Sequence, residues 1–212
     1  KINFCLSSSK ISSFYLKKLG VKKIKYFGNL KFSQSENEKL IKFNHLSKLI
    51  NNKKVWCASS THRNEELICG LAHLELKKKF KNIFTIIIPR HVERTQSIKK
   101  ELQKLNLNVC THGSHVKPDK KIEVYIVDSY GKTKSIYKYC KNIFLGGSLV
   151  RHGGQNPLEA TRYGCKILHG PHVENFKEIY DYLGKLKVST KIKDHSQLSI
   201  KLDKLLSQKN NS

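Results

Sequence analysis

The chain has 212 residues, which is long enough for one good-sized core or two small ones. Hydrophobic residues make up 38% of it and recur in short aliphatic runs, which excludes disorder for most of the length. Lysine and arginine total 41 against 16 acidic residues, a net charge of +25. This charge indicates either a polyanionic partner (nucleic acid, an anionic membrane surface or a phosphorylated substrate) or a compositional bias toward lysine, and it does not decide between them.

Six cysteines lie along the chain without a C-x-x-C spacing, and several fall inside apolar runs. This pattern favours reduced, buried thiols in a cytosolic protein over a disulfide framework or a zinc site. No apolar stretch reaches the roughly 18 residues that a membrane span requires, so we expect any membrane contact to be peripheral. Because the chain begins with Lys1 and contains no methionine, we also expect a fragment, a processed chain or a mis-assigned reading frame.

Three segments are predicted along the chain. Residues 1–32 are expected to end a preceding domain and connect it to the next, with a helix that stops at Gly20 and an extended segment after it. Residues 33–190 are expected to form a Rossmann-like domain. Residues 191–212 are expected to form a last amphipathic helix, carrying Leu198, Leu202 and Leu205, and a frayed end.

Between residues 33 and 190, short aliphatic runs alternate with stretches of helical periodicity. The longest predicted helix places Leu67, Leu71 and Leu74 on one face with Ile68 and Ala72. In chain order the predicted elements are a strand at 55–59, a helix at 64–80, a strand at 83–88, a helix carrying Ile98, Leu102 and Leu105, strands at 107–110 and 123–127, a helix at 133–140, a strand at 142–145, a helix from Pro157, a strand at 166–168 and a helix at 175–183.

This alternation, with its short connections, predicts an α/β fold with a mostly parallel sheet and helices on both faces. In such sheets ligands bind beyond the carboxyl ends of the strands. The residues that directly follow each predicted strand are therefore the candidates for a site.

Two loops are candidates on these grounds. After strand 83–88, Pro89 fixes a turn and Arg90 is placed to grip a phosphate, although a surface arginine would also fit. After strand 55–59, hydroxyl side chains precede Glu65 and Glu66, which suit the dipole of the following helix, so this segment fits capping as well as a site. The Asp128–Lys132 loop alone is an ordinary turn.

The stretch LGGSLVRHGGQNPLEATRYG, residues 145–164, holds the strongest candidate. Gly146, Gly147 and Ser148 end a predicted strand, where glycines permit close approach to the backbone. Asn156 and Pro157 suit a helix cap and a first helical position, whose free N–H groups attract anions. Glu159 offers a carboxylate to sugar hydroxyls. Capping explains Asn156 and Pro157 but not four glycines within nine residues, so a ligand site is favoured.

Several reaction classes are disfavoured. The chain has no G-x-G-x-x-G, no G-x-x-x-x-G-K-[ST] and no G-x-S-x-G motif, and no D-x-D pair for a metal-bound nucleotide. The histidines at 112, 115, 152, 169 and 172 have no carboxylate or cysteine at zinc-ligand spacing, and we expect most of them to face solvent. No metal site is predicted.

Taken together, these segments resemble the C-terminal half of 3-deoxy-D-manno-octulosonic acid (Kdo) transferases, the lipid A glycosyltransferases of Gram-negative bacteria. The motifs occur in the family's order and cover most of the chain from about residue 20 to 190. They are NLKF (29–32), VWCASSTHRNEE (55–66), IIIPRHVER (86–94), LGGSLV (145–150), GGQNPLEA (153–160) and GPHVENFKEI (170–179).

The resemblance implies the C-terminal domain of a GT-B glycosyltransferase, which binds CMP-Kdo without a metal and transfers Kdo to the lipid A precursor lipid IVA at the cytoplasmic face of the inner membrane. Lys132 stands where the family usually has glutamate. No catalytic residue is implied in this chain, because the family's glutamate base lies in an N-terminal domain; the chain alone is expected to be inactive. The implied CMP contacts are Pro89, Arg90, Tyr130, Gly131, Lys132, Asn156, Pro157, Leu158 and Glu159, with Gly146, Gly147 and Ser148 as secondary candidates.

Two other hypotheses stay open. A basic nucleic-acid-binding module would account for the charge, but the chain lacks an aromatic RNP pattern, a recognition-helix motif and a zinc motif, so no specific nucleic acid is expected. A non-catalytic product of a split or decaying transferase gene would account for the short length.

Overall fold

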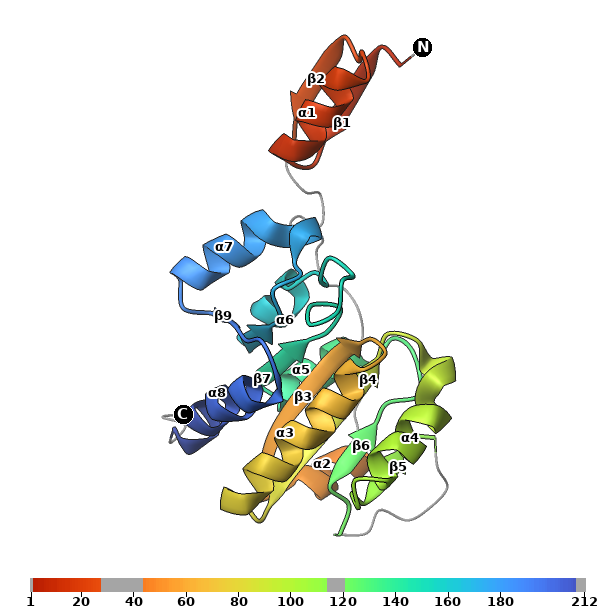
Figure 1. Ribbon diagram of the computed structural model, residues 1–212, viewed down its shortest axis with the longest axis vertical. Helices are drawn as coiled ribbons and strands as arrows, with labels where there is room; N and C mark the ends of the chain where they lie inside the picture. Colours follow the sequence, from red (N-terminus) through yellow and green to blue (C-terminus); the bar gives the residue numbers. More distant parts are fainter. Residues whose placement is uncertain (1, 28–43, 114–120, 209–212) are drawn as a thin grey trace. The chain divides into compact units, whose positions relative to one another are not determined.

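The computed structural model describes residues 2–27, 44–113 and 121–208 (Figure 1). The chain divides into two compact units, residues 1–39 and 40–212. The motif at 29–32 lies outside the described residues.

The first unit contains a β-α-β motif: strand β1 (Phe4–Ser7), helix α1 (Lys10–Lys18) and strand β2 (Lys23–Tyr26), with the two strands parallel. The Ser9 hydroxyl caps α1 by accepting a hydrogen bond from the Ser12 N–H at 3.0 Å. The predicted helix that stops near Gly20 is confirmed. The extended segment after it is a strand, paired with β1, which hydrophobic periodicity did not predict.

The second unit contains a seven-stranded sheet in the order β5-β6-β4-β3-β7-β8-β9, and all six strand pairs are parallel. The predicted parallel sheet is confirmed. All six predicted strands are present, and β9 at the edge is a seventh that the sequence did not predict. The strands are β3 (Lys54–Thr61), β4 (Ile83–Pro89), β5 (Val109–Thr111), β6 (Val124–Ile126), β7 (Asn142–Leu145), β8 (Lys166–His169) and β9 (Ser189–Lys191).

Helices cover both faces of this sheet, as the alternation predicts (Figure 1). Side chains of α2, α5, α6 and α7 enter the core on one face, and those of α3, α4 and α8 enter the core on the other. The helices are α2 (Asn44–Ile50), α3 (Glu65–Lys79), α4 (Thr95–Gln103), α5 (Thr133–Tyr139), α6 (Leu158–Arg162), α7 (Lys177–Lys185) and α8 (His195–Ser207), with short 3₁₀ turns at Val92–Arg94 and Glu174–Phe176.

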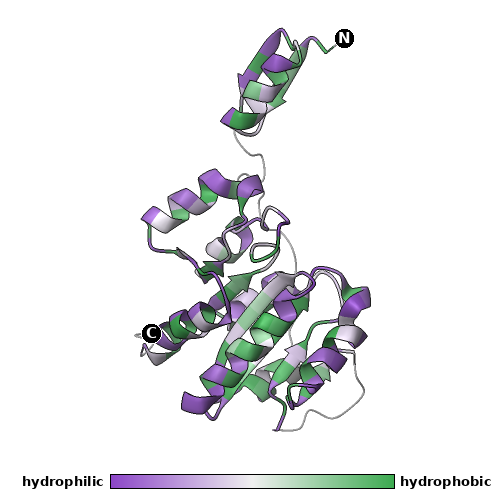
Figure 2. Ribbon diagram, in the orientation of Figure 1, coloured by the Kyte–Doolittle hydropathy of each residue, from purple (hydrophilic) through white to green (hydrophobic). Residues whose placement is uncertain are grey.

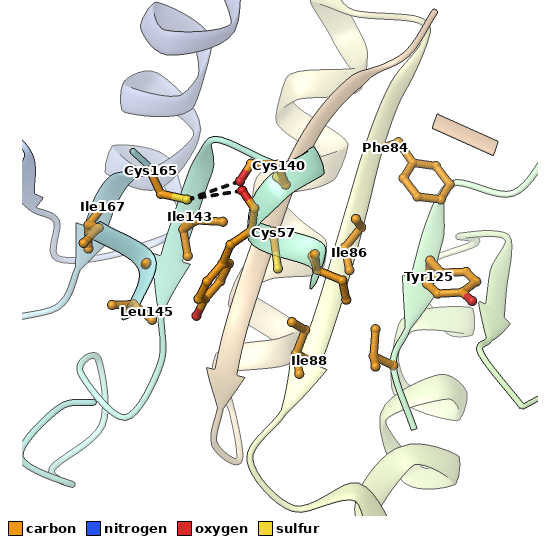
Figure 3. Close-up of a cluster of buried hydrophobic side chains, with 14 of the residues drawn as sticks. Cys57, Phe84, Ile86, Ile88, Tyr125, Cys140, Ile143, Leu145, Cys165 and Ile167 are labelled. Atoms are coloured by element: carbon orange, nitrogen blue, oxygen red, sulfur yellow. Dashed lines mark hydrogen bonds between the residues drawn. The ribbon is translucent and has the colours of Figure 1, made fainter. Parts of the chain in front are cut away.

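Alternate residues of each strand supply the two cores. On β3, Trp56 and Ala58 point to the α3 side and Cys57 to the α5 side. Figure 2 shows hydrophobic residues on helices as well as on strands, and Figure 3 shows the α5-side core, where Cys165 lies beside Cys140. All six cysteines are free, and five of them are buried, which confirms the expectation of buried thiols.

Helix α8 belongs to the second core. Leu198, Leu202 and Leu206 are buried there, against α3 among other elements, while Leu205 is only partly buried. No helix among the described residues has the length and apolar character that crossing a bilayer requires.

His73 of α3 is buried in this unit, and its Nδ1 lies 2.7 Å from the Thr85 hydroxyl. Burial lowers its pKa from 6.5 to about 4; the nearby Glu123 opposes this shift, and Lys77 and Lys53 add to it. The folded chain therefore keeps His73 neutral while the unfolded chain protonates it below pH 6.5. The free energy of unfolding should fall on acidification from pH 7 to 4, by up to about 3 kcal/mol from this residue.

Urea unfolding at pH 7.0 and 4.5 checks this prediction. The drop in unfolding free energy between the two pH values should be smaller in His73→Gln than in the wild type. His172→Gln, which changes a partly exposed histidine, serves as the control and should keep the wild-type drop. Equal drops in the wild type and His73→Gln would contradict the assignment.

Candidate functional site

The predicted site residues lie at one edge of the sheet, because they follow the carboxyl ends of four adjacent parallel strands. The order β6-β4-β3-β7 places the Asp128–Lys132 loop, Arg90, the β3–α3 turn and Gly146 side by side along that edge (Figure 1). Three strand spacings separate β6 from β7, about 14 Å. The edge therefore offers several loops to a single ligand.

At the end of β4, Pro89 is buried and Arg90 is exposed. The Arg90 backbone N–H donates to the Thr61 carbonyl at 2.9 Å, which ties this loop to the end of β3. The backbone is thus fixed while the guanidinium faces solvent at the edge of the sheet, which is the geometry that gripping an anion requires.

The β3–α3 turn differs from the prediction of hydroxyl capping. Asn64 is the N-cap of α3, with φ +77°, and its side chain makes no capping hydrogen bond. Glu65 and Glu66 are fully buried instead of facing solvent at the helix start. Glu66 forms a two-pronged ion pair with Arg94, with distances of 3.0 and 3.1 Å between the paired N and O atoms.

The four glycines after β7 have backbone reasons, contrary to the argument that only a ligand explains them. A Cβ on Gly146 would lie 2.6 Å from Thr61 Cα and also collide with the Ser60 carbonyl oxygen. Gly147, Gly153 and Gly154 have positive φ. The turn closes on itself through the Gly154 N–H, which donates to the Gly147 carbonyl at 2.8 Å.

The start of α6 lies one residue later than predicted: Pro157 is the N-cap residue and the helix begins at Leu158. The Asn156 side-chain oxygen still accepts from the Leu158 N–H at 3.1 Å. Helix α6 has only five residues, so its dipole contributes little and the predicted attraction of anions to the free N–H groups is weak. Glu159 Oε1 lies 3.9 Å from Lys134 Nζ, which links α6 to α5.

The loop after β6 projects into solvent. Tyr130 is 65% exposed, and Gly131 has φ +77° with open space around it. The ammonium of Lys132 lies against His112 of the loop after β5. This loop leads directly into α5, and Glu159 of α6 lies near Lys134 of α5. Both therefore reach the edge of the sheet beside the same helix.

A cavity of about 780 Å³ opens beside these loops, and histidines meet in it. The His62 ring centroid lies 3.9 Å from that of His152 and 5.7 Å from that of His91. The three residues follow β3, β7 and β4. The cavity is lined by His62, Arg63, Asn64, His91, Arg94, Ser97, Glu101, Val150 and His152.

His62 is only 6% exposed. Burial, together with His152, His91 and two arginines, lowers its pKa from 6.5 to about 4. The imidazole is therefore neutral at pH 7 in surroundings of positive potential, which favour an anionic ligand. His169, expected among the solvent-facing histidines, is buried as well. Among the described residues, no cluster of three or more His, Cys, Asp or Glu side chains has a geometry that could hold a metal ion.

No family model matches the chain. A solved structure does: the C-terminal CMP-Kdo binding domain of WaaA from Acinetobacter baumannii aligns with a TM-score of 0.71 and 27% identity, over 77% of this chain and 85% of that domain. Among curated proteins, the Rickettsia conorii 3-deoxy-D-manno-octulosonic acid transferase is 33% identical over 91% of this chain and 41% of its own length.

The chain is related to the Kdo transferases. The Kdo transferase of Haemophilus influenzae is 32% identical over 76% of this chain and 38% of its own length, and that of Aquifex aeolicus is 29% identical over 91% and 51%. The chain thus spans between 38% and 51% of the length of these Kdo transferases. The fold expected from the sequence, that of the C-terminal domain of a GT-B glycosyltransferase, is confirmed.

Proposed function

We propose that this chain binds CMP-Kdo and is the donor-binding half of a glycosyltransferase that moves Kdo to the lipid A precursor lipid IVA in lipopolysaccharide core biosynthesis. The observation that carries the proposal is the match to a CMP-Kdo binding domain over 85% of that domain's length. It is supported by the position of the implied donor contacts, which follow adjacent strands at one edge of the sheet.

In this proposal the chain provides half of the chemistry. An acceptor hydroxyl attacks the anomeric carbon of Kdo, the bond from that carbon to the phosphate oxygen breaks, and CMP leaves with the electron pair. A base in an N-terminal domain takes the hydroxyl proton. Arg90 stabilises the charge that develops on the phosphate, Glu159 and Asn156 hold the nucleotide, and no metal takes part.

Titration calorimetry tests the proposal. The chain should bind CMP and CMP-Kdo with one site and bind UMP and inorganic phosphate much more weakly. Equal affinity for all four ligands would leave only a general anion site and contradict the proposed function. Because the proposed reaction uses a base in an N-terminal domain, transfer of Kdo should appear when such a domain is present together with these residues.

We further propose that the chain works at the cytoplasmic face of the inner membrane and contacts anionic lipid through its lysines. Each lysine near an anionic surface contributes about 1 kcal/mol, and the net charge is +25. The chain should therefore co-sediment with vesicles that contain phosphatidylglycerol, and 0.5 M salt should release it. Equal co-sedimentation with purely zwitterionic vesicles would contradict this part of the proposal.

A further inference from the structure

Glu65 makes an unusual set of hydrogen bonds in the first turn of α3. Its Oε2 accepts from the backbone N–H groups of His62 at 2.9 Å and Gly147 at 2.7 Å. Its Oε1 accepts from the N–H groups of Ser148 at 3.0 Å and Leu149 at 2.9 Å. One buried carboxylate therefore satisfies four backbone donors, and three of them belong to the loop after β7.

These donors lie where the sheet can no longer pair them. Strand β3 ends at Thr61 and β7 ends at Leu145. The Gly146 N–H still donates to the Ser59 carbonyl at 2.9 Å, but the N–H groups of His62 and of residues 147–149 lie beyond the paired strands and donate to Glu65 instead. A buried N–H without an acceptor is strongly unfavourable. The Glu65 carboxylate takes the place of the backbone carbonyl groups that act as acceptors within the paired part of each strand.

The bonding pattern requires the ionised form of Glu65. Two carboxylate oxygens that accept four N–H groups have no place for a carboxyl proton, because that proton would point at a donor. Burial raises the pKa of Glu65, and the four N–H groups oppose that shift. The carboxylate is thus a buried negative charge balanced by backbone dipoles instead of by a cationic side chain.

The loop held by Glu65 is also tied to the next strand. The Ser148 hydroxyl donates to the Leu145 carbonyl at 2.5 Å and accepts from the Gly170 N–H at 2.8 Å. Gly146 permits the approach of the carboxylate, since a Cβ there would lie 2.8 Å from Glu65 Oε2. Glu65 therefore stands at the centre of the connections between the ends of β3, β7 and β8.

We propose that Glu65 is a positioning residue for the donor site: its carboxylate fixes the 146–149 loop against the β3–α3 turn and thereby sets the floor on which the donor lies. This inference rests on the proposed function. Glu65 itself touches no donor atom and acts through the backbone of Gly147 and Ser148.

Glu65→Gln tests the proposal, with Glu66→Gln as its matched control. Both glutamates are fully buried in the same helical turn, but the Glu66 carboxylate pairs with the Arg94 guanidinium instead of with the loop. In Glu65→Gln, an NH₂ group replaces one carboxylate oxygen, and its two N–H donors would face backbone N–H groups that need an acceptor. Each variant is studied at a temperature where circular dichroism shows it folded.

In Glu65→Gln, amide hydrogen exchange at residues 147–149 should accelerate by about 100-fold or more, while exchange in β4 stays slow. CMP affinity should fall by about tenfold or more, because an unfixed loop must be ordered on binding. Glu66→Gln should lose stability without either change. Slow exchange at 147–149 in Glu65→Gln, or equal acceleration in Glu66→Gln, would overturn the proposal.

The two proposals fail in different ways. A wild-type chain that does not bind CMP would contradict the proposed function, whereas the exchange result concerns the loop alone. If Glu65→Gln does not fold, amide hydrogen exchange in the wild-type chain tests the proposal instead. The amides of His62, Gly147, Ser148 and Leu149 should then open together with one free energy, and four independent values would overturn the assignment.

Discussion

Arg90→Ala is expected to weaken CMP binding about 10- to 100-fold, the effect of losing a charge-assisted hydrogen bond to phosphate. The exposed guanidinium projects from a backbone fixed to the end of β3, so little ordering is needed on binding. Arg90→Lys should recover only part of the affinity, because an ammonium cannot bind a phosphate in the two-pronged manner of a guanidinium. Titration calorimetry at constant ionic strength measures both.

Arg162→Ala is the control for the loss of one positive charge. Arg162 is an exposed residue of α6 and is not among the predicted donor contacts. Its replacement should change CMP affinity by no more than about threefold, the effect of a screened surface charge. Equal losses in Arg90→Ala and Arg162→Ala would show that net charge, not a specific contact, holds the phosphate.

Gly146→Ala is expected to lower the free energy of unfolding by about 3 kcal/mol or more, since the neighbouring atoms are backbone and cannot move aside. The added Cβ would lie 2.6 Å from Thr61 Cα and collide with the Ser60 carbonyl oxygen. The β3–α3 turn would have to shift, and with it the Glu65 hydrogen bonds. Denaturant unfolding measures the loss.

Gly184→Ala provides the contrast. Gly184 lies within α7, where the nearest atom to an added Cβ is the Ser189 hydroxyl oxygen at 3.9 Å. Alanine should therefore stabilise the chain by about 0.5 to 1 kcal/mol, because glycine is the poorer helix former. A Gly146→Ala variant as stable as Gly184→Ala would contradict the packing described at the ends of β3 and β7.

Six of the seven strands were predictable because they are short apolar runs that mostly alternate with stretches of helical periodicity, whereas β9, a Ser-Thr-Lys segment, carries no such signal. The face of α3 was not predictable. Leu67, Leu71 and Leu74 were expected to share its apolar face with Ile68 and Ala72. Ala72 is buried as expected, but Ile68 and the three leucines are only partly buried, and Cys69, His73 and Leu76 are buried instead. Small residues permit the close approach of α4: a Cβ on Gly70 would lie 2.7 Å from Leu102 Cδ2. The spacing of the leucines does not reveal that the buried face of α3 is the one with small residues.

The position of the candidate site was predictable from the rule that ligands lie beyond the carboxyl ends of parallel strands. The role of Glu65 was not, because three of its four partners are backbone N–H groups 82 to 84 residues away, which carry no side-chain signal. The histidine cavity had a signal that motif searching missed. His62, His91 and His152 each follow one of three adjacent strands, β3, β4 and β7.

The central claim is that loops after adjacent strands form one donor site at the carboxyl edge of the sheet. A titration of the ¹⁵N-labelled chain with CMP, followed by amide chemical shifts, tests it most directly. We predict that the shifts cluster at Arg90, Gly131, residues 146–148, Asn156, Leu158 and Glu159. Shifts confined to another face, or scattered over the lysine-rich surface, would contradict the account.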